Sequence, residues 1–210
     1  MYNPPYFRED RPDVLHALIR KHSLAALVTL GADGLSANHF PLIFDPEPLP
    51  WGTLRGHMSR QNSQWRGFRT DVDALAIFQG PSVYVTPSWY PSKQESGKVV
   101  PTYNYAVVHA HGPLTIVEDA DLLERHLRAL TALHEEPFAQ PWAVADAPRE
   151  YIRGLLNGIV GIEMPIAKLE GKWKMSQNRD VADRAGVIEG LRARGDRASV
   201  VIADEIEGRL

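Results

Sequence analysis

The side chains best suited to hold an anion gather in one short stretch of the sequence, residues 52–66. A strand-like piece at 53–56 leads into a polar cluster, and a helix-like piece follows at 61–68. The cluster holds side chains that donate hydrogen bonds or carry positive charge: Arg55, His57, Ser59, Arg60, Gln61 and Asn62. The start of a helix also favours negative charge, because its first N–H groups lack partners and its dipole is positive there. This pattern indicates a phosphate or other anion site, and the alternative interpretation is a turn whose polar groups face water.

A second polar stretch, residues 171–179, combines positive charge with an aromatic ring. It holds Lys172, Trp173, Lys174, Gln177 and Arg179. Cationic side chains suit a phosphate, and tryptophan suits the face of a flat ligand. The stretch favours a binding role, with a solvated basic turn as the alternative.

Aromatic residues flank a long polar segment at 87–101. They are Trp89, Tyr90, Tyr103 and Tyr105. Segments of this length without regular structure are usually functional or disordered, and the aromatic residues favour an ordered, functional one. Such rings can stack on a flat heterocycle, although aromatics also serve in cores and interfaces.

The remaining constellations are weaker. His109 and His111 share one face of an expected strand, and with His39 or His57 they could bind a metal. No carboxylate near them in the sequence completes such a set, so we expect no resident metal. The sequence has no Gly-x-Ser-x-Gly motif, no glycine-rich dinucleotide fingerprint and no Walker-type loop.

The elements that must position these residues are mostly short strands. An amphipathic helix is expected at 12–22, a hairpin at 24–44, and strands at 53–56, 74–79 and 82–86, with a turn at Gly80-Pro81. A long strand at 102–117 broken near Gly112-Pro113, a strand at 159–169, helices at 119–134, 149–156 and 181–194, and a charged tail complete the chain. The pattern is mainly β with peripheral helices (α+β), as in a barrel or sandwich, and predicts one domain over residues 1–210.

Composition narrows the class of protein. The chain has 210 residues, and 23 Lys and Arg against 26 Asp and Glu give a net charge of −3, which does not support nonspecific nucleic-acid binding. Arginines in 179–197 alternate with acids, which favours a solvated helix over DNA readout. There is no cysteine, no signal peptide and no apolar run near the roughly 20 residues of a membrane span, so we expect a cytoplasmic protein.

Several segments resemble the PaiB family, described as FMN-binding negative transcriptional regulators. The similar segments are spread along most of the chain: residues 1–4, 37–42, 52–57, 87–93, 98–112 and 169–179. The resemblance implies an antiparallel split β-barrel of the pyridoxamine-phosphate-oxidase-like class, homodimeric, with FMN at the dimer interface and a helical extension at the C-terminus. In that class a Ser-Arg pair after a barrel strand holds the phosphate, and a lysine often follows it; here Ser59-Arg60 is followed by Gln61.

The resemblance and the polar clusters together assign roles to eleven residues. Ser59 and Arg60 would hold the phosphate, with Arg55 nearby, and Asn38, His39 and His57 would line the polar edge of the ring. Trp89, Tyr90 and Trp173 would cover its faces, and the late run with Lys174 and Gln177 would complete the site from the partner subunit.

Three alternatives remain open at this point. A flavin-dependent oxidoreductase would use the same site, with the flavin carrying the chemistry. A haem-binding split barrel would use His39, His57, His109 or His111 as axial ligand. A transcriptional regulator acting directly on DNA is weakly supported, because the sequence shows neither a helix-turn-helix nor net positive charge.

Overall fold

The computed structural model describes residues 1–210, which form two compact units. The first unit comprises Met1–Leu18, Gln79–His109 and Glu170–Leu210, and the second comprises Ile19–Phe78 and Ala110–Leu169. Each unit is therefore assembled from segments that are distant in the sequence. A single domain over residues 1–210, barrel closure and the homodimer remain predictions.

The second unit is built on antiparallel strands, as the sequence predicts. Its strands are β2 (Leu24–Gly31), β3 (Gly34–Pro41), β4 (Ile43–Asp45), β5 (Thr53–Ser59), β8 (Thr115–Val117), β9 (Ile159–Pro165) and the first part of β6 (Ala74–Val85). The hairpin of β2 and β3 closes with Gly31 opposite Gly34, and β2 pairs with β6 on its other side. A separate sheet has the strand order β4-β5-β9-β8.

Strand β5 separates a core face from a polar face. Leu54, Gly56 and Met58 are buried, whereas Arg55 and His57 are half-buried and Ser59 is exposed. Successive side chains of a strand point to opposite sides, so this alternation follows directly from the order of residues. The polar side chains predicted to form the site thus lie on one face of β5.

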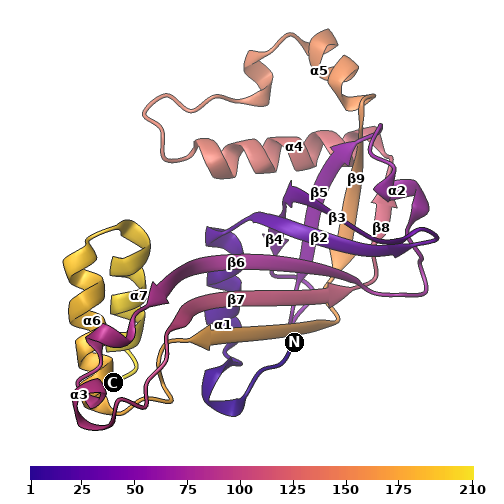
Figure 1. Ribbon diagram of the computed structural model, residues 1–210. Coiled ribbons are helices and arrows are strands. Elements are labelled where there is room, and N and C mark those ends of the chain that lie inside the picture. Colours follow the sequence, from indigo (N-terminus) through magenta and orange to yellow (C-terminus); the bar gives the residue numbers. More distant parts are fainter. The chain divides into compact units, whose positions relative to one another are not determined.

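Three helices complete the second unit: α2 (Gln64–Gly67), α4 (Ala120–Glu135) and α5 (Arg149–Leu156), with a short 3₁₀ turn, η3 (Val144–Asp146), before α5. The side chain of Asp119 caps α4 by accepting a hydrogen bond from the Leu122 N–H at 2.9 Å. Leu123 of α4 packs with Ile152 and Leu156 of α5 in a small apolar cluster. This cluster holds α4 and α5 together (Figure 1).

The first unit has the strand order β1-β10-β7-β6. Its elements are η1 (Pro5–Phe7), β1 (Arg8–Glu9), most of α1 (Pro12–Lys21), η2 (Pro87–Trp89), α3 (Ser92–Ser96), β7 (Thr102–Gly112, to His109), β10 (Lys168–Lys174, from Glu170), α6 (Val181–Arg194) and α7 (Arg197–Glu207). Helix α1 packs closely on β10, because a Cβ built on Gly171 would lie 2.1 Å from Leu15 Cδ2.

Helices α6 and α7 form a pair at the C-terminal end, in the yellow segment of Figure 1. Val187 and Leu191 of α6 and Ile202 and Ile206 of α7 are fully or almost fully buried. The buried Arg184 donates to the carbonyl oxygens of Ile206 and Arg209 at 3.3 and 2.6 Å and so holds the last turn.

Several sequence-based expectations were wrong. The segment at 87–101 contains η2 and α3, and the strand expected at 159–169 is split between β9 and β10. Residues 74–85 form one strand without a turn at Gly80-Pro81, because Gly80 allows a close approach to Ala106 rather than a bend. Residues 171–174, for which a basic turn is the alternative interpretation above, belong to strand β10, where Lys172 Nζ lies 5.6 Å from the centre of the Tyr105 ring. The charged tail is helix α7, which Asp196 caps.

None of the helices combines the length and the apolar character that a membrane-crossing segment needs.

The packing of Trp89 on α6 yields a stability prediction. A Cβ built on Gly190 would lie 2.3–2.5 Å from indole atoms of Trp89, so Gly190→Ala should lower the free energy of unfolding by about 1–3 kcal/mol. The control is Gly154→Ala in α5, where a Cβ meets nothing and helix propensity favours alanine by roughly 1 kcal/mol. Chemical denaturation of both variants checks this, and equal effects at the two glycines would contradict it.

Candidate functional site

The candidate site lies on the polar face of β5 in the second unit. Arg55, His57 and Ser59 follow one another at every second position, so they form a row along the strand. Arg55 and Ser59 are four residues apart, which corresponds to roughly 13 Å along a strand. The row therefore has a basic end at Arg55 and a hydroxyl end at Ser59.

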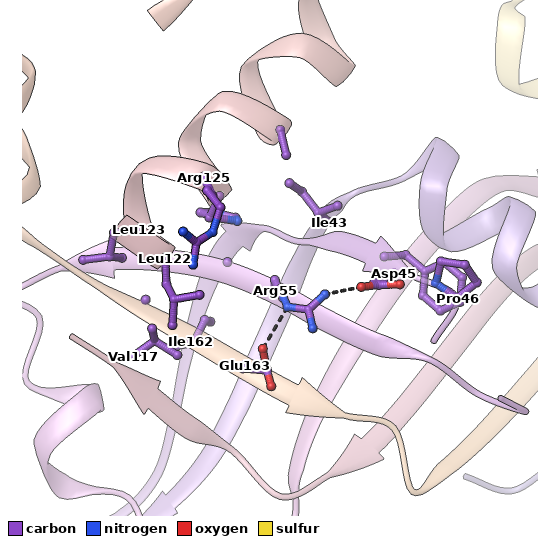
Figure 2. A pocket seen from close by; sticks show the side chains of 15 residues that line it. Ile43, Asp45, Pro46, Arg55, Val117, Leu122, Leu123, Arg125, Ile162 and Glu163 are labelled. Carbon is purple, nitrogen blue, oxygen red and sulfur yellow. Dashed lines mark hydrogen bonds and ion pairs between the residues drawn. The ribbon is translucent and has the colours of Figure 1, made fainter. Parts of the chain in front are cut away.

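Arg55 is held between two carboxylates. Its Nε donates to Glu163 Oε2 at 2.8 Å, and its Nη1 pairs with Asp45 Oδ2, as Figure 2 shows. The Glu47 N–H and the Arg55 guanidinium together hold the pKa of Asp45 below its usual value. Arg55 was expected near a phosphate, but its charge is already balanced by these two acids.

His57 pairs with a histidine that the sequence did not single out. His57 Nδ1 and His126 Nε2 of α4 lie 3.1 Å apart, with the rings edge to face. Burial lowers the pKa of both, and for His126 nearby His57 and Arg55 add to the effect and bring the pKa to about 4. Both rings are therefore neutral near pH 7, so one nitrogen donates and the other accepts.

A cavity of about 560 Å³ opens beside Arg55. Its lining comes from β4, β5, β8, β9 and α4 and includes Ile43, Phe44, Val117, Leu122, Leu123 and Ile162 together with Arg125 and His126 (Figure 2). The size is typical of small-molecule pockets. Gly161 makes room for α4 here, because a Cβ at that position would lie 2.9 Å from Leu123 Cδ2.

Two arginines follow the Ser59 end of the row, the half-buried Arg60 and the exposed Arg66. Arg60 Nη1 donates to Glu118 Oε1 at 2.5 Å, and Arg60 Nε donates to the Asn157 carbonyl oxygen at 3.2 Å. The guanidinium carbons of Arg60 and Arg66 lie 5.7 and 4.3 Å from the Trp65 ring centre. Two guanidinium groups thus lie against one aromatic ring near this end, and Glu118 pairs with one of them, that of Arg60.

Asn38 and His39 lie on β3. Asn38 Nδ2 donates to Gln64 Oε1 at 2.9 Å, and Gln64 in turn donates to the Leu27 carbonyl oxygen and to Thr29 Oγ1. Asn38 therefore helps fasten α2 to the hairpin. His39 is exposed.

The other five predicted residues belong to the first unit. Tyr90 and Trp173 are 2% and 3% exposed, and Arg179 lies 4.7 Å above the Tyr90 ring. Trp89 is half-buried against α6. Gln177 closes a turn by donating to the Trp173 carbonyl oxygen and accepting from the Met175 N–H.

Lys174 sits in a group of positive charges. Its Nζ contacts Thr102 Oγ1 and donates to the Tyr103 carbonyl oxygen at 2.9 Å. Burial lowers the pKa of Lys174, and the positive charges of Lys172 and Arg179 lower it further. An anion bound here would relieve this repulsion.

Sequence reasoning missed five residues of the second-unit site: Asp45, Glu118, Arg125, His126 and Glu163. Four residues of α4 line the cavity, and they follow one another at intervals of three, one and three positions: Leu122, Arg125, His126 and Ala129. This spacing marks one face of a helix and was readable from the sequence. The acids could not be found in this way, because their partners are distant in the chain.

Comparison with known proteins supports a flavin-related family. A family model described as "Putative FMN-binding domain" matches residues 1–168. The chain is 30% identical over 210 residues to the protease synthase and sporulation protein PAI 2 of Bacillus subtilis, covering 100% of this chain and 98% of that protein. It is also 34% identical over 244 residues to an uncharacterized protein of Emericella nidulans, covering 100% and 97%.

Two solved structures share the fold at low sequence identity. One is a flavocytochrome from Azotobacter vinelandii, with a TM-score of 0.59, 11% identity and coverage of 86% of this chain and 75% of that one. The other is a FAD- and haem-binding protein from Mycobacterium smegmatis, with a TM-score of 0.58, 14% identity and coverage of 85% and 78%.

The buried histidine pair predicts a pH dependence of stability. The pKa of His126 is about 4 in the folded chain against 6.5 for the free side chain, so the unfolded chain binds more protons between these values. Stability is therefore lost as the pH falls from about 6.5 to about 4, by on the order of 2 kcal/mol after allowance for solvent screening.

His126→Leu should remove the loss of stability that protonation of His126 causes. The free energy of unfolding of wild type and variant is measured at pH 7 and at pH 4.5, and the variant should lose less between the two. His134→Leu, at an exposed histidine of the same helix, is the control and should leave the wild-type pH profile unchanged. Parallel pH profiles of wild type and His126→Leu would show that the pair does not titrate in this way.

Proposed function

Because the chain belongs to the PaiB family of FMN-binding domains, we propose that it is an FMN-binding protein whose phosphate site is Ser59 and Arg60. The observation that carries this proposal is the pair of arginines, Arg60 and Arg66, that lie against the Trp65 ring and follow Ser59 at the end of β5. Guanidinium groups bind phosphate with charge-assisted, paired hydrogen bonds, so this donor set fits the phosphate of FMN.

Arg66 offsets a departure from the related class. Gln61 stands where that class often has a lysine, so the residue directly after Ser59-Arg60 adds no charge. Arg66 is exposed and lies against the same Trp65 ring as Arg60, which places a second cation close to the pair. We infer that Arg66 takes over the role of the missing lysine.

We propose that His57 and one of two β3 residues line the polar edge of the ring, because Asn38 and His39 are consecutive in the strand and point to opposite faces. FMN, when bound, supplies one- and two-electron chemistry, and the protein supplies orientation and electrostatics. His57 and His126 add hydrogen-bonding capacity without adding charge, since both pKa values are lowered by burial. His57 would thus orient the polar edge of the flavin through a hydrogen bond from its neutral ring, as donor or as acceptor.

The first unit of a second copy is proposed to complete the site in a homodimer. Lys174, Gln177 and Trp89 are half-buried and offer donors and an aromatic edge, while the repulsion among Lys174, Lys172 and Arg179 favours an anion. Tyr90 and Trp173 are almost fully buried, so they support this surface from beneath rather than cover a ring. If the protein is a transcriptional regulator, we propose that its bound flavin controls that activity.

The phosphate assignment predicts the effect of a double substitution. Ser59→Ala with Arg60→Ala removes charge-assisted hydrogen bonds, so the Kd for FMN should rise roughly tenfold to a hundredfold. Quenching of flavin fluorescence on titration with protein measures this. Arg69→Ala is the matched control, because Arg69 is an exposed arginine of the same unit that pairs with Asp71. Unchanged FMN affinity in the double variant would refute the assignment.

Glu118 is predicted to weaken phosphate binding. Its carboxylate already occupies Arg60 at 2.5 Å and repels an incoming phosphate, so Glu118→Gln should tighten FMN binding roughly fivefold. Riboflavin lacks the phosphate, and its affinity should stay within about twofold. An equal gain for both flavins would show that Glu118 acts elsewhere than on the phosphate.

A further inference from the structure

The cavity beside Arg55 is not used by the FMN phosphate site. It lies against the face of α4 that carries Leu122, Arg125, His126 and Ala129. The proposed phosphate residues, Ser59 and Arg60, are not part of its lining. The cavity is therefore free to bind a ligand other than the phosphate of FMN.

The walls of the cavity are apolar. Ile43 of β4, Val117 of β8, Ile162 of β9 and Leu122 and Leu123 of α4 line it. Leu122 is 46% exposed, although it is a large apolar residue on a helix that packs onto a sheet. An apolar ligand that covered Leu122 would gain roughly 25 cal/mol for each Å² removed from water.

The charges of the cavity differ between its two sides. On the strand side, Arg55 is balanced by Asp45 and Glu163, and Asp45 is further fixed by the Glu47 N–H at 3.0 Å. On the helix side, Arg125 is exposed, and no hydrogen bond or ion pair joins it to another residue. A ligand with one anionic group is therefore attracted to Arg125 and repelled by the two acids opposite.

We propose that this cavity binds a small apolar acid, with its anionic group on Arg125 and its apolar body against Leu122, Val117 and Ile162. Arg125 is the group that selects the anion, because His126 beside it is neutral near pH 7. A guanidinium matches the two oxygens of a carboxylate or sulfonate, so the pairing also fixes the orientation of the ligand. The proposal does not depend on FMN.

Two fluorescent probes of similar shape and different charge test the proposal. They are 1-anilinonaphthalene-8-sulfonate, which is anionic, and N-phenyl-1-naphthylamine, which is neutral. Wild-type protein should bind the anionic probe saturably and more tightly than the neutral one. Arg125→Gln should weaken the anionic probe about tenfold, which corresponds to loss of one charge-assisted pair, and leave the neutral probe within about twofold.

Arg128→Gln is the matched control. Arg128 lies on the same helix but pairs with Glu124 at 2.5 Å and is not in the lining of this cavity, so its loss should change neither affinity. Ala129→Phe is a second variant, which places a ring in the cavity and should abolish binding of both probes. Circular dichroism confirms that each variant is folded.

Two results would overturn the proposal. Unchanged affinity of Arg125→Gln for the anionic probe would show that Arg125 does not select the ligand. Full binding of the anionic probe by folded Ala129→Phe would show that the probe lies elsewhere on the protein.

Discussion

Strand β5 must satisfy two environments with seven residues, and the site depends on how it does so. Leu54 and Met58 are buried in the core of the second unit, which fixes the register of β5 against β9. A shift of one residue would place Arg55 and His57 in the core at a large energetic cost. Core packing therefore determines where the polar row lies, and with it the position of the proposed anion site.

Neutralisation of charge then divides the polar face into distinct regions. Arg55 is balanced by Asp45 and Glu163, and the paired rings of His57 and His126 carry no charge near pH 7. Arg60 is paired with Glu118, so the positive charge that is left lies on Arg66 near that end of β5 and on Arg125 of α4. The two proposed anion sites therefore have different neighbours: Trp65 and the Ser59 hydroxyl in one, and apolar walls in the other.

The sequence predicted the antiparallel strands, the hairpin at Gly31–Gly34 and helices α4, α5 and α6 well, because local periodicity and turn residues encode them. The sequence also singled out Ser59, the last residue of β5, and Arg60, which follows it, and their role as a phosphate site stays a prediction. It could not identify Glu163 or His126 as partners of Arg55 and His57, which are 108 and 69 residues away in the chain. The burial of Trp173 likewise depends on packing between distant segments of the chain. The polar residues around it in the sequence suggested a ligand contact, whereas the structure shows Trp173 buried in the core.

The measurement that tests the FMN assignment most directly is an absorbance spectrum from about 300 to 700 nm of protein purified with added FMN and then desalted. If the FMN site is as proposed, the spectrum shows the two bands of oxidised flavin at about one flavin per chain. A spectrum without these bands, from folded protein, would contradict the claim that the β5 row and its arginines hold FMN.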